Sequence, residues 1–219
     1  MKLEEMDRDG ALGEALETLH GSTRGAFLRR AVVGSGALLA ATAVPASAAV
    51  GRRDTAILNY ALTLEYVQDA FYSEVDRIGS LTGALAEQAR VVGGHERAHV
   101  KALREVLGSR AVKRPRFDFR GATEDAERFR KTAVAFEDLA VAAYKGQAPL
   151  IQDRAYLVPA LAIHSVEARH AAWIRRLAGI VPAAEAFDEP RSKASTLGIV
   201  EDTHFIVQTR SRRKPKFTG

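Results

Sequence analysis

The sequence predicts an all-α protein, a bundle of four long helices with one long crossover between the second and third helices. Two observations lead to this fold class. Apolar residues recur every three or four positions in four segments of more than twenty residues each, as expected for helices that bury one face. The links inside the first and last pairs of segments are short, whereas a stretch of extended character separates the two pairs.

The first two helices are predicted at about 54–78 and 81–107. Asp54 stands where an N-terminal cap would lie, because a carboxylate there can accept hydrogen bonds from the free N–H groups of the first turn. Gly79 and Gly108 follow the last periodic residues, and glycine readily takes the left-handed conformation that ends a helix. The short link predicts an antiparallel pair.

The last two helices are predicted at about 123–145 and 153–178, with Gly146 ending the third helix. The eight or so residues between them again predict an antiparallel pair. Residues 109–122 form the crossover, in which Pro115 disfavours helix. Fully extended, this segment reaches about 46 Å, longer than a 25-residue helix of about 37 Å. The crossover can therefore run the whole length of the bundle.

The chain is predicted to consist of three regions: an export signal at 1–48, the bundle at 49–190, and a C-terminal extension at 191–219 with a basic, disordered tail. The signal combines flanking arginines, an uncharged stretch, and a small-residue cleavage site at 46–48. It is similar to a twin-arginine signal, although the arginine pair, Arg29 and Arg30, follows the Phe-Leu pair instead of preceding it. An uncleaved membrane anchor is the alternative.

Composition narrows the location and the partners. The signal predicts export to the periplasm, the cell envelope or the extracellular space. The chain has no Cys, which excludes disulfides and thiolate metal sites. The net charge of +5 derives mainly from the tail after residue 208, so the body is close to neutral and we expect no nucleic-acid partner. The basic tail could contact an anionic envelope surface.

A carboxylate and imidazole pattern occurs twice, about 71 or 72 residues apart, and each copy has a lone Glu followed some thirty residues later by Glu-x-x-His. Residues three apart on a helix point to the same side, so each Glu-x-x-His offers an oxygen and a nitrogen ligand to one point. Four carboxylates also balance two divalent cations, which allows burial. The six metal-ligand candidates are Glu65, Glu96, His99, Glu137, Glu167 and His170.

Three further polar residues lie near these candidates along the helices. Tyr72 and Tyr144 each follow a lone Glu by seven residues, so they face the interior two turns away, as hydrogen-bonding partners of the site or as core residues. Asp69 stands one turn after Glu65, where it could hold a ligand His or contribute to a polar rim.

Residues 54–190 resemble the ferritin-like superfamily, in particular the exported ferritin-like proteins labelled desiccation-related. The resemblance rests on Leu58 to Glu65, His95 to His99, Phe136 to Asp138 and Val166 to His170. It implies a ferritin-like four-helix bundle. It further implies that Glu96 and Glu167 bridge two metal ions, that the two lone Glu residues each chelate one, and that the two His residues each bind one.

Carboxylate and imidazole ligands suit iron or manganese, so we expect two Fe or two Mn ions per chain and a small oxidant, O2 or peroxide, as substrate. The protein would then be a ferroxidase or a peroxide-consuming protein of oxidative stress. It could instead be a structural bundle stapled by metal, a bundle that binds metal poorly, or an iron-storing cage. A homo-oligomer is compatible with each of these.

His95 to His99 also match H-E-x-x-H, the motif of zinc metallopeptidases, in which both His residues bind zinc and Glu96 activates water. This alternative leaves Glu167, His170 and the lone Glu residues without a role. It also lacks an evident third ligand.

Overall fold

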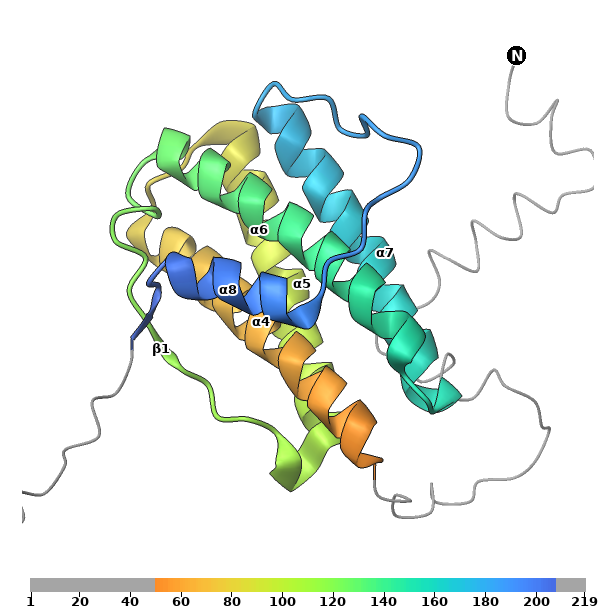
Figure 1. The fold of residues 1–219 in the computed structure, drawn as a ribbon. Helices are drawn as coiled ribbons and strands as arrows, with labels where there is room; N and C mark the ends of the chain where they lie inside the picture. Colours follow the sequence, from red (N-terminus) through yellow and green to blue (C-terminus); the bar gives the residue numbers. More distant parts are fainter. Residues whose placement is uncertain (1–49, 208–219) are drawn as a thin grey trace, which may run out of the picture. The chain divides into compact units, whose positions relative to one another are not determined.

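A computed structural model describes residues 50–207 of the chain. The predicted export signal and the basic tail after residue 207 lie outside the described residues. Four long helices form the bundle, accompanied by a shorter helix, two short 3-10 helices and two short strands (Figure 1). The elements are α4 (Arg52–Ile78), α5 (Gly83–Leu107), η1 (Gly108–Arg110), β1 (Arg116–Phe117), α6 (Ala126–Gln147), η2 (Ala148–Leu150), α7 (Arg154–Leu177), α8 (Lys193–Asp202) and β2 (Ile206–Val207).

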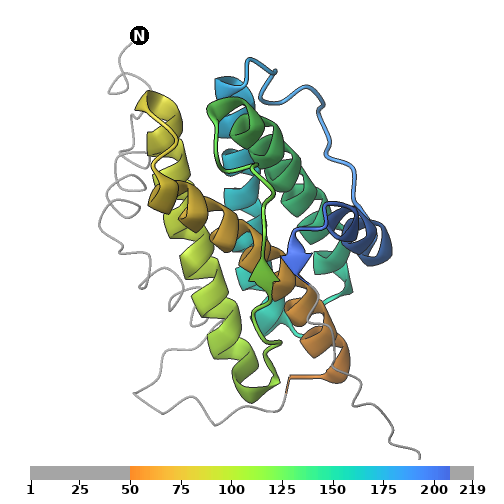
Figure 2. The ribbon, with the colours of Figure 1, turned by 90° about the vertical axis from the view of Figure 1, so that its left-hand side faces the viewer.

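The helices pair as the link lengths predict. α4 packs against α5 and α6 packs against α7, each pair antiparallel, and α4–α6 and α5–α7 contacts close the bundle. Figure 2 shows the crossover returning along the bundle from the end of α5 to the start of α6. Its middle, β1, pairs antiparallel with β2, with Phe117 opposite Ile206. The predicted all-α bundle with one long crossover is confirmed.

Glycine and aspartate mark most of the helix ends. Gly79 ends α4 in the left-handed region at φ 68°, and Gly108 follows the last residue of α5. Asp125 and Asp153 cap α6 and α7, since each side chain accepts hydrogen bonds from backbone N–H groups of the first turn.

Two predicted helix signals are wrong. α4 begins at Arg52, and Asp54 does not cap it: its buried carboxylate accepts hydrogen bonds from the backbone N–H groups of Gln152 and Asp153, at 3.0 Å each. Asp54 thus ties α4 to the segment before α7. Gly146 does not end α6, which continues to Gln147.

Gly146 is needed for a close approach of two segments. A Cβ atom at this position would lie 2.0 Å from the backbone oxygen of Arg191. Here the chain passes over the end of α6, where the N–H of Arg191 donates to the carbonyl of Ala142 at 2.9 Å. The segment continues into α8, which packs on α6.

The core at the α6 N-terminal end of the bundle is aromatic. Phe71, fully buried on α4, stacks on Phe129 at a centroid distance of 5.2 Å and meets Phe119 and Phe136 edge-on. Phe205, just before β2, completes the cluster against Phe119. The crossover and the C-terminal segment are therefore anchored in the same core as the long helices.

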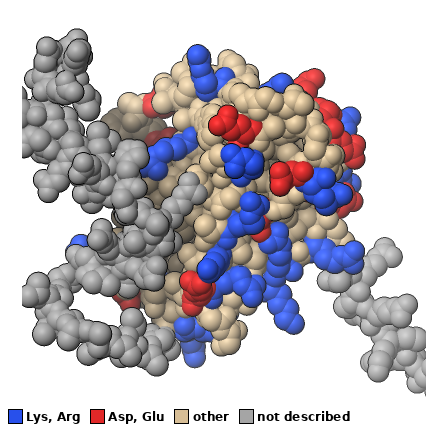
Figure 3. Space-filling model, turned by 180° about the vertical axis from the view of Figure 1, so that it is seen from behind, with Lys and Arg blue, Asp and Glu red and all other residues tan. Residues whose placement is uncertain are grey.

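The surface carries charges of both signs. Figure 3 shows Lys and Arg side chains gathered over the lower part of one face, with Asp and Glu between them and along its edge. On α5, for example, Nζ of Lys101 lies 3.9 Å from Oε1 of Glu105 in an exposed ion pair. Within residues 50–207, no helix combines the length and the apolar character needed to cross a lipid bilayer.

Candidate metal centre

The six predicted ligand candidates meet at one level in the interior of the bundle. α4 contributes Glu65 and α6 contributes Glu137, while α5 and α7 each contribute a Glu and a His three residues apart. Their ligand atoms form two groups, and within each group all atoms lie within 4.8 Å of one another. One group is Glu65, Glu96, His99 and Glu167; the other is Glu96, Glu137, Glu167 and His170.

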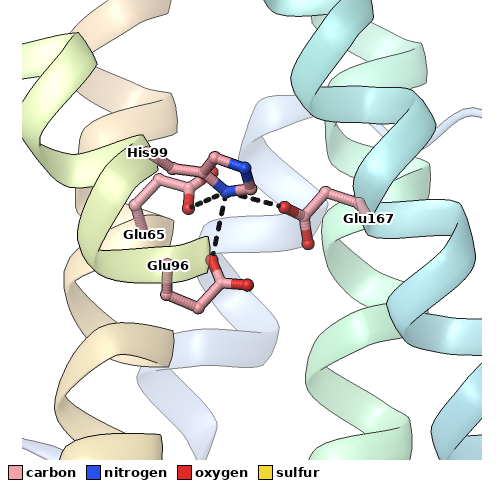
Figure 4. A group of neighbouring side chains, drawn as sticks. All are labelled: Glu65, Glu96, His99 and Glu167. Atoms are coloured by element: carbon pink, nitrogen blue, oxygen red, sulfur yellow. Dashed lines mark hydrogen bonds and ion pairs between the residues drawn. The ribbon is translucent and has the colours of Figure 1, made fainter. Parts of the chain in front are cut away.

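The first group surrounds the Nδ1 atom of His99 (Figure 4). This nitrogen lies 3.2 Å from Oε2 of Glu65, 3.4 Å from Oε2 of Glu96 and 3.1 Å from Oε1 of Glu167. The three carboxylates come from three different helices. One ion at this point would therefore join α4, α5 and α7.

The second group surrounds the Nδ1 atom of His170 in the same manner. This nitrogen lies 3.0 Å from Oε1 of Glu96, 3.4 Å from Oε2 of Glu137 and 3.6 Å from Oε2 of Glu167. One ion here would join α5, α6 and α7.

Glu96 and Glu167 belong to both groups. Each directs one carboxylate oxygen toward His99 and the other toward His170. Glu65 and Glu137 belong to one group each. The geometry thus places the two shared carboxylates between two potential ion positions and the two lone carboxylates at the outer sides.

All four carboxylates are fully buried, and His170 is 2% exposed. Several inward-facing atoms have no hydrogen-bond partner among the described residues, although they lie close together: both oxygens of Glu96 and Glu167, Oε2 of Glu137 and Nδ1 of His170. Buried polar atoms normally form hydrogen bonds, so close-lying atoms that lack them fit a site that binds a further group, such as a metal ion. The donor set of hard oxygens and imidazole nitrogens fits divalent cations.

Electrostatics inside the cluster couple the carboxylates to the imidazoles. Burial, with the nearby Glu167, raises the pKa of Glu96 well above its ordinary value. Burial opposes charging of the imidazole of His170, but the close carboxylates of Glu137, Glu167 and Glu96 outweigh it and raise its pKa to about 12. Burial likewise opposes charging of His99, and the neighbouring carboxylates raise its pKa. Without a metal, protons therefore neutralise the site.

The pKa of Glu167 moves in the opposite direction from that of Glu96. Burial alone would raise it, but the close, positively charged imidazoles of His170 and His99 lower it to about 2. One shared carboxylate is thus held ionised between two imidazoles while the other tends to hold a proton.

Two tyrosines bind the lone carboxylates across the bundle. Tyr72 on α4 donates to Oε1 of Glu137 on α6, and Tyr144 on α6 donates to Oε1 of Glu65 on α4, both at 2.5 Å. Each lone carboxylate thus has one oxygen fixed by a tyrosine and the other facing an imidazole. The tyrosines, for which sequence spacing left two roles open, are hydrogen-bonded to the site.

Asp69 takes no part in the cluster. Its buried carboxylate pairs with Arg114 of the crossover and accepts a hydrogen bond from Ser73 at 3.2 Å. Of the two roles that the sequence left open for Asp69, the structure shows no contact with a ligand His and a polar contact with the crossover instead. Its partner comes from a segment distant in sequence, which helical spacing cannot show.

His95, the first residue of the H-E-x-x-H match, lies behind the site. Its Nδ1 is 2.8 Å from Nε2 of His170, on the side of that ring away from the carboxylates. His95 belongs to neither convergent group, so its ring and that of His99 do not face one ion as the zinc peptidase arrangement requires. Sequence spacing did not reveal this contact, because His170 comes from another helix.

Residues 53–179, more than half of the chain, match the family model described as the ferritin-like domain. The chain belongs to the ferritin-like family. A search of curated proteins found no match to it. The matched range spans the four long helices and all six ligand candidates of this ferritin-like protein. Its buried Glu and His groups could bind metal ions.

Proposed function

We propose that this ferritin-like protein holds two iron or two manganese ions between its four helices and uses them to reduce O2 or peroxide. The observation that carries the proposal is the pair of overlapping groups, which share Glu96 and Glu167 and each have a His and a lone Glu of their own. Four carboxylates offset the charge of two divalent cations, which makes a buried pair of ions affordable.

The bound ions would supply redox chemistry, since two ions that each give one electron together reduce one peroxide to water. The protein's own residues would hold them and keep the site dry. Tyr72 and Tyr144 hold Glu137 and Glu65 in place through buried O–H groups that donate to these carboxylates. Burial raises the pKa of both tyrosines well above the ordinary value, so both stay protonated.

The place of action proposed is outside the cytoplasm, where the protein would remove oxidants. The support is the N-terminal pattern of residues 1–48, with its arginines, uncharged stretch and cleavage site. A small oxidant would be the substrate, and the basic tail could hold the protein at an anionic surface. The absence of Cys means that electrons for repeated turnover would come from a separate donor.

The test is oxidant consumption by the full chain loaded without oxygen with Fe(II) or Mn(II). After mixing with O2 or hydrogen peroxide, we expect rapid loss of oxidant that the Glu96→Ala/Glu167→Ala variant does not produce. A variant with two exposed glutamates of α5 replaced, Glu87→Ala/Glu105→Ala, should behave as the wild type.

A second candidate is a structural bundle in which the ions only staple the helices. It is favoured by the position of the site, where each ion would join three helices. A wild-type protein that contains two ions per chain but consumes neither oxidant would establish this role and overturn the redox proposal.

A further inference from the structure

His170 is held on both sides of its ring. Nδ1 faces the carboxylates of its group, and Nε2 meets Nδ1 of His95 at 2.8 Å. The two rings lie nearly edge to edge in one plane: their planes are inclined by only 17°, and their centroid distance of 5.1 Å is close to the 2.8 Å nitrogen–nitrogen contact plus the two ring radii. The contact is therefore an in-line hydrogen bond between two nearly coplanar rings.

The corresponding position in the other half of the site has different chemistry. The two halves repeat in order, so that a lone Glu, a Tyr, a shared Glu and a His of α4–α5 each have a counterpart in α6–α7. The residue before the shared Glu is His95 in the first half and Val166 in the second. A valine side chain cannot form a hydrogen bond. His170 therefore has the ring nitrogen of His95 behind it. The counterpart of His95 in the other half, which the repeat relates to His99, is the hydrocarbon side chain of Val166.

Metal binding demands one particular form of a histidine. A ligand imidazole is neutral, so if Nδ1 faces the ion, the single ring proton sits on Nε2. In His170 that N–H would donate to Nδ1 of His95. An outer partner of this kind fixes the tautomer and orientation of the ring and strengthens its electron donation to the metal.

We propose that His95 is a positioning residue for His170, and that it makes the two ion positions unequal, with the position formed by Glu96, Glu137, Glu167 and His170 binding its ion more tightly. The inference rests on the proposed two-ion site and goes beyond it, because it ranks the two positions. The filling order follows: the His170 position fills first.

Two substitutions separate the hydrogen bond from the packing. His95→Phe keeps a planar ring beside His170 but has no nitrogen to accept a hydrogen bond. His95→Asn lacks the ring but places an amide group near the position of Nδ1, so it can restore the hydrogen bond. Val166→Ala, at the corresponding position of the other half, is the matched control.

The readout is a calorimetric titration of the metal-free full chain with Mn(II), which needs no turnover. We expect two unequal binding steps in the wild type and in Val166→Ala. In His95→Phe the tighter step should weaken about 10- to 100-fold, the usual effect of losing such a partner, and His95→Asn should recover most of it. Circular dichroism of each metal-free variant checks that the helices are intact.

Variants that lack a ligand of only one ion position show at which position His95 acts. Glu65→Ala removes a ligand used only at the His99 position, and Glu137→Ala removes one used only at the His170 position. Adding His95→Phe should weaken Mn(II) binding in the Glu65→Ala background and leave it unchanged in the Glu137→Ala background. Equal effects in both backgrounds would overturn the proposal.

Other results would also overturn it, in distinguishable ways. Two ions bound by His95→Phe as tightly as by the wild type would reject the role of His95 and leave the two-ion site intact. Weakening that His95→Asn does not restore would assign the effect to packing. A wild type that binds no Mn(II), Fe(II) or other divalent cation would reject the two-ion site and this inference together.

Discussion

Glu96 and its imidazole neighbours illustrate how protons and metal ions compete for the same interior. Burial and the nearby Glu167 raise the pKa of Glu96, and the carboxylates raise the pKa values of His99 and His170. At neutral pH the metal-free site is therefore a set of protonated imidazoles paired with carboxylates. A metal ion must displace these protons, because a ligand imidazole binds in its neutral form.

We accordingly predict that metal affinity rises steeply with pH and that binding releases protons. Titrations with Mn(II) between about pH 6 and about pH 8, in buffers of different ionisation enthalpy, measure both quantities. The two imidazoles and Glu96 should each contribute to the released protons, so that more than one proton is released when two Mn(II) ions bind. A site of ordinary exposed carboxylates, which are already ionised at neutral pH, would release none, and that result would contradict this description of the interior.

The sign of the accompanying stability effect follows from linkage. The pKa of His170 is raised from 6.5 to about 12 in the folded state, so its proton stabilises the metal-free fold fully below pH 6.5. That stabilisation is lost as the pH rises toward about 12. Glu167 acts at acidic pH. Its pKa is lowered to about 2 in the folded state, so its ionised carboxylate stabilises the fold above pH 4.5, and that stabilisation is lost as the pH falls toward 2.

At the scale of single residues, the ligand candidates were predictable and most of their partners were not. The six candidates follow from helical spacing and from the repeat, both of which are local properties of the sequence. The contacts Tyr72–Glu137, Tyr144–Glu65 and His95–His170 join different helices, so they depend on how the helices pack. The choice between the two roles of Asp69 depends on packing too, since its partner Arg114 belongs to the crossover.

At the scale of elements, the long helices were predictable because apolar periodicity and terminal glycines or aspartates agree. Helix α8 was not predicted. Its sequence has no clear apolar stripe, and Gly198 stands in its middle. In the structure only Thr196 and Val200 of this helix are buried. It forms where the chain returns over α6, and tertiary contacts therefore decide its structure.

The return segment provides a prediction at Gly146. A Cβ atom there would meet the backbone oxygen of Arg191, and backbone cannot move aside as a flexible side chain can. Gly146→Ala should therefore push the segment off α6 and break the Arg191–Ala142 hydrogen bond. We expect a loss of about 1–3 kcal/mol in the free energy of unfolding, measured in urea.

The matched control is the same substitution in an open part of a helix. A Cβ at Gly198 in α8 would meet no atom within 4 Å. Gly198→Ala should stabilise the protein by about 0.5–1 kcal/mol, the usual difference between glycine and alanine inside a helix. If Gly146→Ala also stabilised the protein, the close approach of the return segment would be wrong.

At the scale of the whole bundle, the site lies between the two helical hairpins. The first group takes ligands from α4, α5 and α7, and the second from α5, α6 and α7. Each ion would therefore connect the α4–α5 hairpin to the α6–α7 hairpin. Ligands that bind only the folded state stabilise it, by about 2.7 kcal/mol at a concentration 100 times the dissociation constant.

The aromatic core and the site stabilise different parts of the bundle. Phe71 and its neighbours join α4, the crossover, α6 and the segment before β2 at one end. A site filled with metal would crosslink the middle of all four helices. Removal of metal should thus loosen the middle of the bundle without unfolding the aromatic end.

The most direct test of the central claim is the metal content per chain of the full protein purified without chelator, beside the Glu96→Ala/Glu167→Ala variant. Elemental analysis should find two Fe or two Mn ions per wild-type chain and none in the variant. The Glu87→Ala/Glu105→Ala control should keep both ions. A single zinc ion that survives Glu167→Ala, or a wild-type protein that binds no metal when supplied with Fe(II) or Mn(II), would contradict the account.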